Sequence, residues 1–193
     1  MKLRGLYAIT AEAGDLERKV RLALEGGIAL LQYRSKARDH AQAATIVRMA
    51  HDYGVPVIIN DDVELALALD AAGAHLGGDD GDLRAARERL GARLLGASCY
   101  NQLERARAAV QAGADYIAFG SVFASPTKPA AVRAPLGLFA HRLGVPLAAI
   151  GGITLDNAPQ LIAAGADLLA VISDLFDAPD IRQRARDYGK LFA

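Results

Sequence analysis

Several features are scarce in this sequence, and each scarcity excludes a class of protein. Cys99 is the single cysteine, so the chain forms no internal disulfide and offers no cysteine cluster for zinc. Lys plus Arg and Asp plus Glu number 22 each, and the net charge of zero gives no bulk attraction to nucleic acid or an anionic membrane. No apolar run reaches the roughly 18 residues of a membrane span, and residues 1–6 lack a signal peptide's apolar stretch. We therefore expect a cytoplasmic protein that binds neither nucleic acid nor membrane.

Apolar residues are abundant, at 52% against 23% charged residues, which excludes a disordered chain. Short apolar runs, most of them continuous, are typical of parallel strands buried on both faces. They predict strands near residues 4–10, 28–34, 56–60, 74–77, 94–98, 115–121, 147–151 and 167–172. Ala and Leu at helical spacing predict helices near 15–26, 39–53, 62–72, 82–91, 102–113, 135–144, 155–165 and 179–191.

A short repeat supports this alternation of strands and helices. Ala-Gly-Ala followed by His or Asp begins at residues 72, 112 and 164, before the fourth, sixth and eighth strands, and residues 25–28 are a weaker copy. Glycine at that place fits a left-handed helix cap. Eight strand–helix units, with this repeat before every second strand, predict an α/β protein with one compact (β/α)8 TIM barrel over residues 1–193. The alternative is an open doubly wound sheet, which would normally need fewer strands at this length.

In such a barrel the chemistry lies at the carboxyl ends of the strands. Gln32, Arg34 and Lys36 alternate at the end of the second strand, so an extended chain puts all three on one side. Two cations and an amide that converge on the barrel mouth suit a polyanion such as pyrophosphate. The alternative is a solvated basic loop.

Acidic residues follow the third and fourth strands. Asn60 and Asp61 end the third strand, and Asp79 and Asp80 follow the fourth. A carboxylate from each of two neighbouring loops, together with substrate phosphate oxygens, is a usual way to hold Mg²⁺. The alternative is that these residues only cap the helices that follow them.

Small and hydroxyl residues follow the other strands. Ser98 ends the fifth strand and can hydrogen-bond a substrate. The sequence shows no obvious His–Asp relay that would activate Ser98 as a nucleophile. Residues 121–129 form a Ser/Pro/Thr/Lys loop whose hydroxyls and Lys128 suit a phosphate, unless it is a simple surface loop. Gly151 and Gly152 follow the seventh strand, where backbone amides can approach a phosphate, or where they form only a tight turn.

The histidines and the cysteine have simpler interpretations. His75 lies inside the fourth strand and is expected to be a hydrogen-bonded interior residue, and Cys99 a small core residue. His40, His51 and His141 fall on predicted helices with the wrong spacing for a shared metal, so we expect surface positions. The barrel mouth thus combines two anion-binding regions with a candidate Mg²⁺ pair, which implies one diphosphate and one monophosphate substrate.

Together these motifs resemble the thiamine phosphate synthase family over nearly the whole chain. The matching segments are Leu6-Tyr7-Ala8-Ile9-Thr10, Gln32-Tyr33-Arg34-Ser35-Lys36, Ile59-Asn60-Asp61, His75-Leu76-Gly77, Gly96-Ala97-Ser98, Pro126-Thr127-Lys128, Ile150-Gly151-Gly152-Ile153 and Val171-Ile172-Ser173. The resemblance implies a Mg²⁺-dependent transferase of thiamine biosynthesis. Such an enzyme joins hydroxymethylpyrimidine diphosphate to thiazole phosphate, or its carboxylate form, and gives thiamine phosphate and pyrophosphate.

The resemblance also implies roles for individual residues. The pyrimidine diphosphate would be held by Gln32, Tyr33, Arg34, Ser35, Lys36, Asn60, Ser98 and Lys128. The thiazole phosphate would be held by Ser125, Pro126, Thr127, Gly152, Ile172 and Ser173. Asp61 and Asp80 would bind Mg²⁺. The catalytic set would be Arg34, Lys36, Ser98 and Lys128.

The implied chemistry is a dissociative substitution at an exocyclic CH₂, in which the aminopyrimidine expels pyrophosphate and the thiazole nitrogen captures the cation. No enzyme base or nucleophile is required, because the protein neutralises the leaving group and aligns the two rings. This accounts for the lack of a catalytic His–Asp or Cys–His pair in the sequence.

The sequence departs from the family pattern at two positions. Gly78 stands where Gln is usual, which predicts a looser Asp80 loop, and Ser125 stands where Thr is common, which keeps the hydroxyl. One alternative function is that of a thiazole tautomerase, a related isomerase that would need neither the acidic pair nor the basic cluster. The other is a non-catalytic barrel that binds a phosphorylated ligand.

Overall fold

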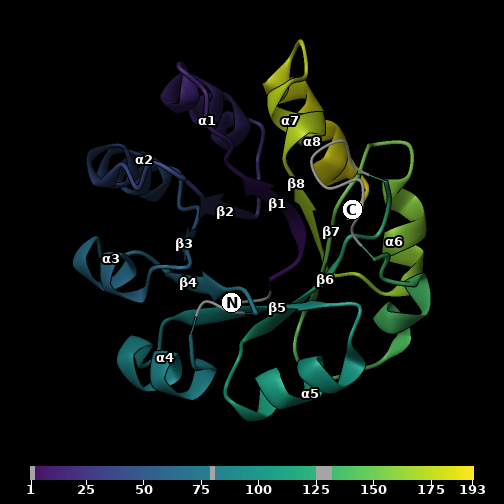
Figure 1. Ribbon diagram of the computed structural model, residues 1–193. Coiled ribbons are helices and arrows are strands. Elements are labelled where there is room, and N and C mark those ends of the chain that lie inside the picture. Colours follow the sequence, from purple (N-terminus) through teal and green to yellow (C-terminus); the bar gives the residue numbers. More distant parts are fainter. Residues whose placement is uncertain (1–2, 79–80, 125–131) are drawn as a thin grey trace.

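The computed structural model of the chain describes residues 3–78, 81–124 and 132–193. Its eight parallel strands form a closed barrel in the order β1 to β8, with helices packed around the outside (Figure 1). The strands are β1 (Gly5–Ile9), β2 (Leu30–Tyr33), β3 (Val57–Asn60), β4 (Gly73–Leu76), β5 (Leu94–Tyr100), β6 (Tyr116–Gly120), β7 (Leu147–Ile150) and β8 (Leu168–Val171). The closed order confirms the predicted (β/α)8 fold and excludes the open doubly wound sheet.

The helices follow the strands in alternation, with two departures from the prediction. They are α1 (Leu16–Glu25), α2 (His40–Asp52), α3 (Val63–Ala68), α4 (Leu83–Leu90), α5 (Leu103–Gln111), η1 (Leu136–Ala140), α6 (Ala158–Ala164), α7 (Ser173–Phe176) and α8 (Ile181–Lys190). The helix expected near residues 135–144 is only the short 3₁₀ helix η1, since Gly137 within it disfavours a longer helix. The short α7, directly after β8, was not expected. None of the described helices is long and apolar enough to cross a membrane.

The strands are buried on both faces, as their continuous apolar sequences predict. Outward-facing residues pack against the helices in one large apolar cluster. Inward-facing residues fill the barrel with a smaller cluster, which consists of Leu3, Tyr7, Ile9, Leu30, Ile58, Tyr116, Ala118, Ala148, Leu168 and Ala170. The barrel interior is therefore a packed core, and a ligand has access only at its ends.

The aspartates of the Ala-Gly-Ala-Asp repeat join neighbouring strands. Asp115 donates its backbone N–H to the Leu95 carbonyl at 2.7 Å, and its carboxylate accepts the Leu95 N–H at 2.7 Å. Asp167 makes the same pair of bonds with Leu147, at 2.8 and 3.0 Å. Each aspartate thus fixes the start of its own strand to the start of the preceding one, which gives the repeat a structural role.

The glycines of the repeat do not all serve the same purpose. Gly113 and Gly165 adopt left-handed φ values of 96° and 114° at helix ends, which confirms the predicted caps. Gly73 is different, and the prediction of a cap is wrong there. It lies inside β4, where a Cβ would come within 1.9 Å of the Leu94 carbonyl oxygen, so close strand packing requires the glycine.

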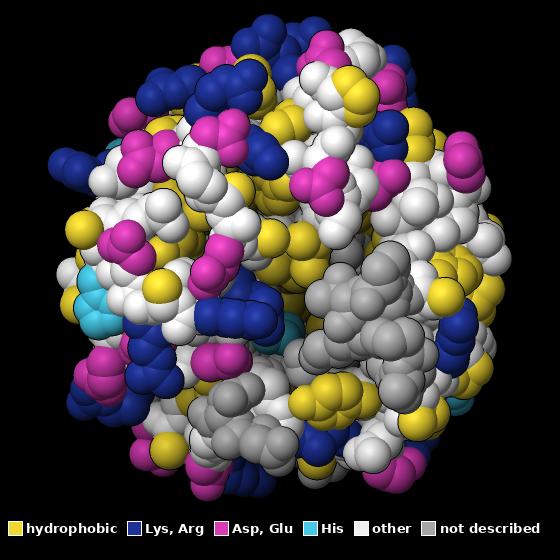
Figure 2. Space-filling view, turned by 45° about the horizontal axis from the view of Figure 1, so that its top comes forward, with side chains coloured by type: hydrophobic (Ala, Val, Ile, Leu, Met, Phe, Trp, Pro, Cys, Tyr) yellow, Lys and Arg dark blue, Asp and Glu magenta, His cyan; other side chains and the backbone are white. Residues whose placement is uncertain are grey.

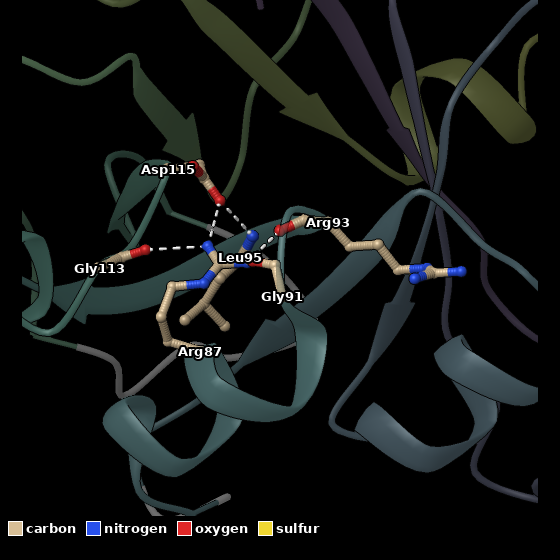
Figure 3. Close-up of polar contacts among 6 residues, drawn as sticks. All are labelled: Arg87, Gly91, Arg93, Leu95, Gly113 and Asp115. Carbon is tan, nitrogen blue, oxygen red and sulfur yellow. Dashed lines mark hydrogen bonds and ion pairs between the residues drawn. The ribbon is translucent and has the colours of Figure 1, made fainter.

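Arg87 of α4 ties together segments at the amino end of the strands (Figure 3). Its Nη1 donates to the Asp115 carboxylate at 2.8 Å and to the Gly113 carbonyl at 3.1 Å. Its Nη2 donates to the carbonyls of Gly91, at 2.7 Å, and of Arg93. Because this end of a (β/α)8 barrel carries stability rather than chemistry, we assign the cluster to the fold.

Candidate functional site

The candidate site lies at the carboxyl ends of the strands, where β1 to β8 pass into their helices. Figure 2 shows a face of the molecule that is hollowed near its centre, with apolar side chains inside the hollow and Lys and Arg side chains beside it. An apolar hollow with basic residues at its rim suits a ligand that combines a flat ring with a phosphate.

The basic loop after β2 is held in place by the loop after β1. Thr10 accepts the Arg34 N–H at 2.8 Å and donates its hydroxyl to the Arg34 carbonyl at 3.1 Å. The Glu12 carboxylate accepts the N–H groups of Lys36, at 2.6 Å, and Ala37, at 3.2 Å. Arg34 and Lys36 are exposed, Ser35 between them is partly buried, and neither cation forms an ion pair with a described residue. The loop therefore presents two positive charges that form no ion pair within the described part of the chain.

Gln32 and Tyr33 point in opposite directions, as neighbours on a strand must. The Gln32 side chain lies inside the barrel and donates its amide N–H to the Tyr7 hydroxyl at 2.6 Å. Tyr33 packs outward and donates its hydroxyl to the Asp39 carbonyl at 2.9 Å and to the Gln42 side chain at 3.3 Å. Burial raises the pKa of the Tyr33 hydroxyl. The structure thus brings Gln32 to the site, but not the side chain of Tyr33.

A chain of hydrogen bonds continues from Tyr7 across the barrel interior. The Tyr7 and Tyr116 hydroxyls are 2.7 Å apart, and the Tyr116 hydroxyl is 3.0 Å from His75 Nδ1. His75 Nε2 is 2.9 Å from the Ser98 hydroxyl, which confirms His75 as a hydrogen-bonded interior residue. Ser98 thus has a histidine partner, but a tyrosine hydroxyl occupies the place at Nδ1 that a carboxylate takes in a serine triad.

Burial shapes the chemistry of this interior. It raises the pKa of both the Tyr7 and the Tyr116 hydroxyl, so both stay protonated at physiological pH. It also raises the pKa of the Cys99 thiol to about 12, which confirms Cys99 as a core residue rather than a nucleophile. The other histidines, His40, His51 and His141, are exposed as predicted.

The acidic residues after β3 divide into a helix cap and a candidate ligand. Asp62 caps α3, since its carboxylate accepts the Leu65 N–H at 2.8 Å. Asp61 has a left-handed φ of 60°, donates its N–H to the His75 carbonyl at 2.8 Å and is exposed. Its carboxylate accepts a hydrogen bond from the Asn60 amide. The cap is therefore neither Asn60 nor Asp61.

After β4 the structure describes only the acidic residue that caps the next helix. Asp82 caps α4 by accepting the Arg84 N–H at 2.7 Å, whereas Asp79 and Asp80 lie outside the described residues. Within the described part of the chain no group of three or more His, Cys, Asp or Glu side chains could hold a metal. Mg²⁺ does not need such a group, because it commonly takes one or two carboxylates and completes its shell with water and phosphate oxygens. Asp61 fits that kind of site.

The loop after β4 is fixed at Gly78 by two residues from neighbouring elements. The Tyr100 hydroxyl accepts the Gly78 N–H at 3.1 Å, and Arg105 donates to the Gly78 carbonyl at 2.8 Å. The Arg105 guanidinium also lies 5.4 Å from the centre of the Tyr100 ring. A Cβ at position 78 would come within 2.5 Å of Arg105 Nη2. Gly78 itself is therefore held on both sides, and the looser Asp80 loop that the resemblance implies lies outside the described residues.

The ends of β6, β7 and β8 form the other side of the mouth. The chain after β6 pairs with β7 through the Phe123 N–H and the Gly151 carbonyl, at 3.0 Å. Gly152 has a φ of 63°, and a Cβ there would lie 2.3 Å from the Ala124 carbonyl oxygen. Ile172 is partly buried, and exposed Ser173 begins α7. Four predicted phosphate contacts, Ser125, Pro126, Thr127 and Lys128, lie outside the described residues.

Three residues of the interior received no role in the sequence analysis: Tyr7, Tyr116 and Gly96. A Cβ at Gly96 would come within 2.3 Å of the Tyr116 hydroxyl and 2.5 Å of His75 Nδ1. The sequence did contain a signal for the two tyrosines, since each lies in an apolar strand of the predicted barrel. A phenol buried inside a barrel needs a hydrogen-bond partner, so two such tyrosines indicate a polar network in the interior.

Comparisons with known proteins agree with this geometry. The family model described as thiamine monophosphate synthase matches residues 6–175. The chain is 60% identical to a thiamine-phosphate synthase of Aromatoleum aromaticum, over 99% of this chain and 97% of that protein. It is 52% identical to one of Thiobacillus denitrificans, over 98% and 95%. A solved thiamine phosphate pyrophosphorylase from Pyrococcus furiosus is 33% identical and superimposes with a TM-score of 0.86, covering 99% of this chain and 96% of that one.

Proposed function

The chain belongs to the thiamine monophosphate synthase family, and we infer from this membership and from the barrel mouth that it acts as a thiamine-phosphate synthase. This is a transferase activity, which joins hydroxymethylpyrimidine diphosphate to thiazole phosphate with loss of pyrophosphate. The observation that supports this function most directly is the arrangement of polar residues along β2 and the loop after it. Gln32 reaches into the barrel, while Arg34 and Lys36 follow at its exposed rim. A ring in the hollow would thus have its diphosphate beside two cations.

The residues of the mouth would act by binding and charge neutralisation. Gln32 and Ser98 orient the pyrimidine, and Asn60, Ser35 and the backbone around Tyr33 complete the wall beside it. Arg34, Lys36 and Lys128 bind the diphosphate, whose negative charge grows as pyrophosphate leaves. Preorganised positive charge at such a place lowers the barrier because it interacts most strongly with the transition state. No protein base is needed for this substitution.

Asp61, together with Asp80, would hold Mg²⁺ beside the diphosphate. The bound cation supplies further neutralisation of the leaving pyrophosphate. The support for Asp61 is its exposed carboxylate at the tip of β3 and the fact that Asp62 performs the capping role. The Asp61 N–H donates to the His75 carbonyl and so fixes the Asp61 backbone to β4. The side chain of Asp61 therefore starts from a fixed position at the mouth.

The thiazole phosphate would bind on the opposite side of the mouth, after β6, β7 and β8. Gly152, Ile172 and Ser173 would hold its phosphate there, together with Ser125, Pro126 and Thr127. Loops after the seventh and eighth strands, with a short extra helix, form a recurrent phosphate site in these barrels. The short helix α7 after β8 supports this placement. The substrates are small phosphorylated molecules, and we propose that the protein meets them in the cytoplasm.

The direct test is to incubate the purified protein with both substrates and Mg²⁺ and to detect thiamine phosphate and pyrophosphate. Omission of either substrate, or addition of a chelator, should abolish the product. Arg34→Ala should lose most of the activity, while Arg48→Ala, which removes an exposed arginine of α2, should keep it. Isomerisation of a thiazole carboxylate phosphate without condensation would instead identify a tautomerase. Binding of the phosphorylated compounds without any product would identify a non-catalytic barrel.

A further inference from the structure

Five polar side chains from five strands form one continuous hydrogen-bonded chain through the barrel interior. In order they are Gln32, Tyr7, Tyr116, His75 and Ser98, with successive contacts of 2.6, 2.7, 3.0 and 2.9 Å. The first four residues are buried, and Ser98 is partly buried at the end of β5. Both ends of this chain are residues that the proposed function places against the pyrimidine.

The direction of the hydrogen bonds follows from the number of protons available. The Gln32 amide donates to the Tyr7 hydroxyl, so the single proton of Tyr7 is left for the Tyr116 hydroxyl. Tyr116 in turn has its proton left for His75 Nδ1, which must then be the acceptor. A ring with an unprotonated Nδ1 carries its proton on Nε2, and that proton is donated to the Ser98 oxygen.

With the Gln32 amide nitrogen, rather than its oxygen, facing the Tyr7 hydroxyl, the opposite direction leaves a buried group without a partner. If His75 carried its proton on Nδ1, it would donate to Tyr116, and Tyr116 would donate to Tyr7. The Tyr7 oxygen would then receive protons from both Tyr116 and Gln32, and its own proton would have no acceptor among the described residues. Tyr7 is only 1% exposed, so bulk water does not reach that proton, and a buried unpaired hydroxyl is costly.

We propose that this buried chain locks His75 in its Nε2–H tautomer and thereby fixes the hydrogen-bonding polarity of the pyrimidine site. With the His75 proton on its oxygen, Ser98 can donate its own proton to an acceptor on the substrate. At the other end the Gln32 amide nitrogen bonds Tyr7, which leaves its carbonyl oxygen to accept from a donor such as an amino group. A heteroaromatic ring that carries both a ring nitrogen and an amino group matches this pair.

The inference rests on the proposed function only for the identity of the ring. Tyr7, Tyr116 and His75 do not touch the substrate in this scheme, so they are positioning residues. Gly96 belongs to the same arrangement, because a side chain at that position would overlap the Tyr116 hydroxyl and His75 Nδ1.

The two tyrosines provide a matched pair for testing the lock. Tyr7→Phe and Tyr116→Phe each remove one buried hydroxyl from the same interior, so the loss of packing is comparable. Only Tyr116 contacts His75. Long-range ¹H–¹⁵N spectra of the unliganded ¹⁵N-labelled protein report the tautomer of each of the four histidines, with His75→Gln to assign the signal. We expect Nε2–H in the wild type and a mixture with Nδ1–H in Tyr116→Phe. Tyr7→Phe should keep Nε2–H, because His75 Nδ1 is then the one acceptor among the described residues for the buried Tyr116 proton.

Kinetics test whether the fixed His75 tautomer affects the reaction through Ser98. Loss of one hydrogen bond worth about 1.4 kcal/mol corresponds to about tenfold in rate, so Tyr116→Phe should lower kcat about tenfold at unchanged KM for thiazole phosphate. Ser98→Ala combined with Tyr116→Phe should be no slower than Ser98→Ala alone, whereas independent structural defects would multiply. Ser98→Thr keeps a hydroxyl at this position, so adding Tyr116→Phe to it should again lower kcat.

Two results would overturn the proposal: Nδ1–H on His75 in the wild type, or multiplicative effects of Ser98→Ala and Tyr116→Phe with an unchanged His75 tautomer. The spectra need neither substrate nor turnover. Absence of thiamine phosphate would therefore refute the proposed function, while the tautomer of His75 would still decide on the lock.

Discussion

Gly96 of β5 lies directly against the phenol of Tyr116 on β6, so that a Cβ at position 96 would come within 2.2 Å of Tyr116 Cζ. The absence of a side chain at one strand position thus makes room for a hydroxyl on the next. That hydroxyl links His75 to Tyr7, and the polar interior depends on the space left by a single glycine.

Gly96→Ala should therefore destabilise the protein by about 1–3 kcal/mol, the usual cost of overpacking a core. Urea unfolding followed by circular dichroism measures this free energy. Gly189→Ala is the control, because a Cβ there meets no atom within 4 Å and the residue lies in helix α8. It should be neutral or stabilising by up to about 1 kcal/mol. Equal unfolding midpoints for the two variants would contradict the close contact at Gly96.

Neighbouring aspartates after β3 should give opposite phenotypes. Asp61→Asn should lose most activity at ordinary Mg²⁺ with little change in stability, because asparagine tolerates the left-handed backbone at this position. Asp62→Ala should retain activity but lose about 1 kcal/mol of stability, since it removes the cap of α3. Turnover titrated with Mg²⁺ and thermal unfolding separate the two effects. Near-normal turnover of Asp61→Asn would remove the metal assignment.

Asp80→Ala should resemble Asp61→Asn, because both residues are proposed as Mg²⁺ ligands, and Asp79→Ala should matter less. The same Mg²⁺ titration tests this. If Asp79→Ala were the slower of the two, the other member of the pair would be the ligand.

Lys128→Ala should slow the chemical step more than it weakens binding of thiazole phosphate. A charge that stabilises the departing pyrophosphate acts mainly in the transition state, so its loss lowers kcat, by about a hundredfold for about 3 kcal/mol. Single-turnover rates with both substrates saturating provide the measurement. An unchanged saturated rate with a raised KM for thiazole phosphate would place Lys128 in the monophosphate site instead.

The Arg87 and Asp115 pair should affect stability alone. Asp115→Ala removes acceptors of the Leu95 N–H and of the Arg87 guanidinium, and we expect a loss of about 1–3 kcal/mol. Activity per folded molecule should stay the same, because the pair lies at the end of the barrel away from the mouth. Glu64→Ala, which breaks the exposed ion pair with Arg89, should cost at most about 1 kcal/mol. A fall in kcat for Asp115→Ala would contradict this division of the barrel.

Cys99 should resist alkylation in the folded protein. Burial raises the pKa of its thiol to about 12, so the reactive thiolate is nearly absent at about pH 8, and the side chain is inaccessible. Mass spectrometry after iodoacetamide treatment should show no adduct under native conditions and one adduct in urea. Activity unchanged by the native treatment would also exclude a catalytic thiol. Rapid native labelling would show that the β5 region opens.

Much of the fold could be predicted from local patterns. Continuous apolar strands and amphipathic helices follow from residue periodicity, and the Ala-Gly-Ala repeat marked the strand starts correctly. The helix near η1 was overestimated because the apolar pattern left out the low helix propensity of Gly137. The short α7 was missed because four residues carry no periodicity.

The sequence by itself determined the barrel, the order of the strand ends and the residue types that gather there, because period and spacing are properties of the chain alone. Only the tertiary structure decided which way each of those residues faces. It turned Tyr33 outward toward α2, gave the capping role to Asp62 rather than Asp61, and brought His75 to Ser98 across neighbouring strands. The physical reason is that hydrogen bonds inside a closed barrel join residues far apart in the chain, such as Tyr7 and Tyr116, and their partners are chosen by strand register and by the space that Gly96 leaves.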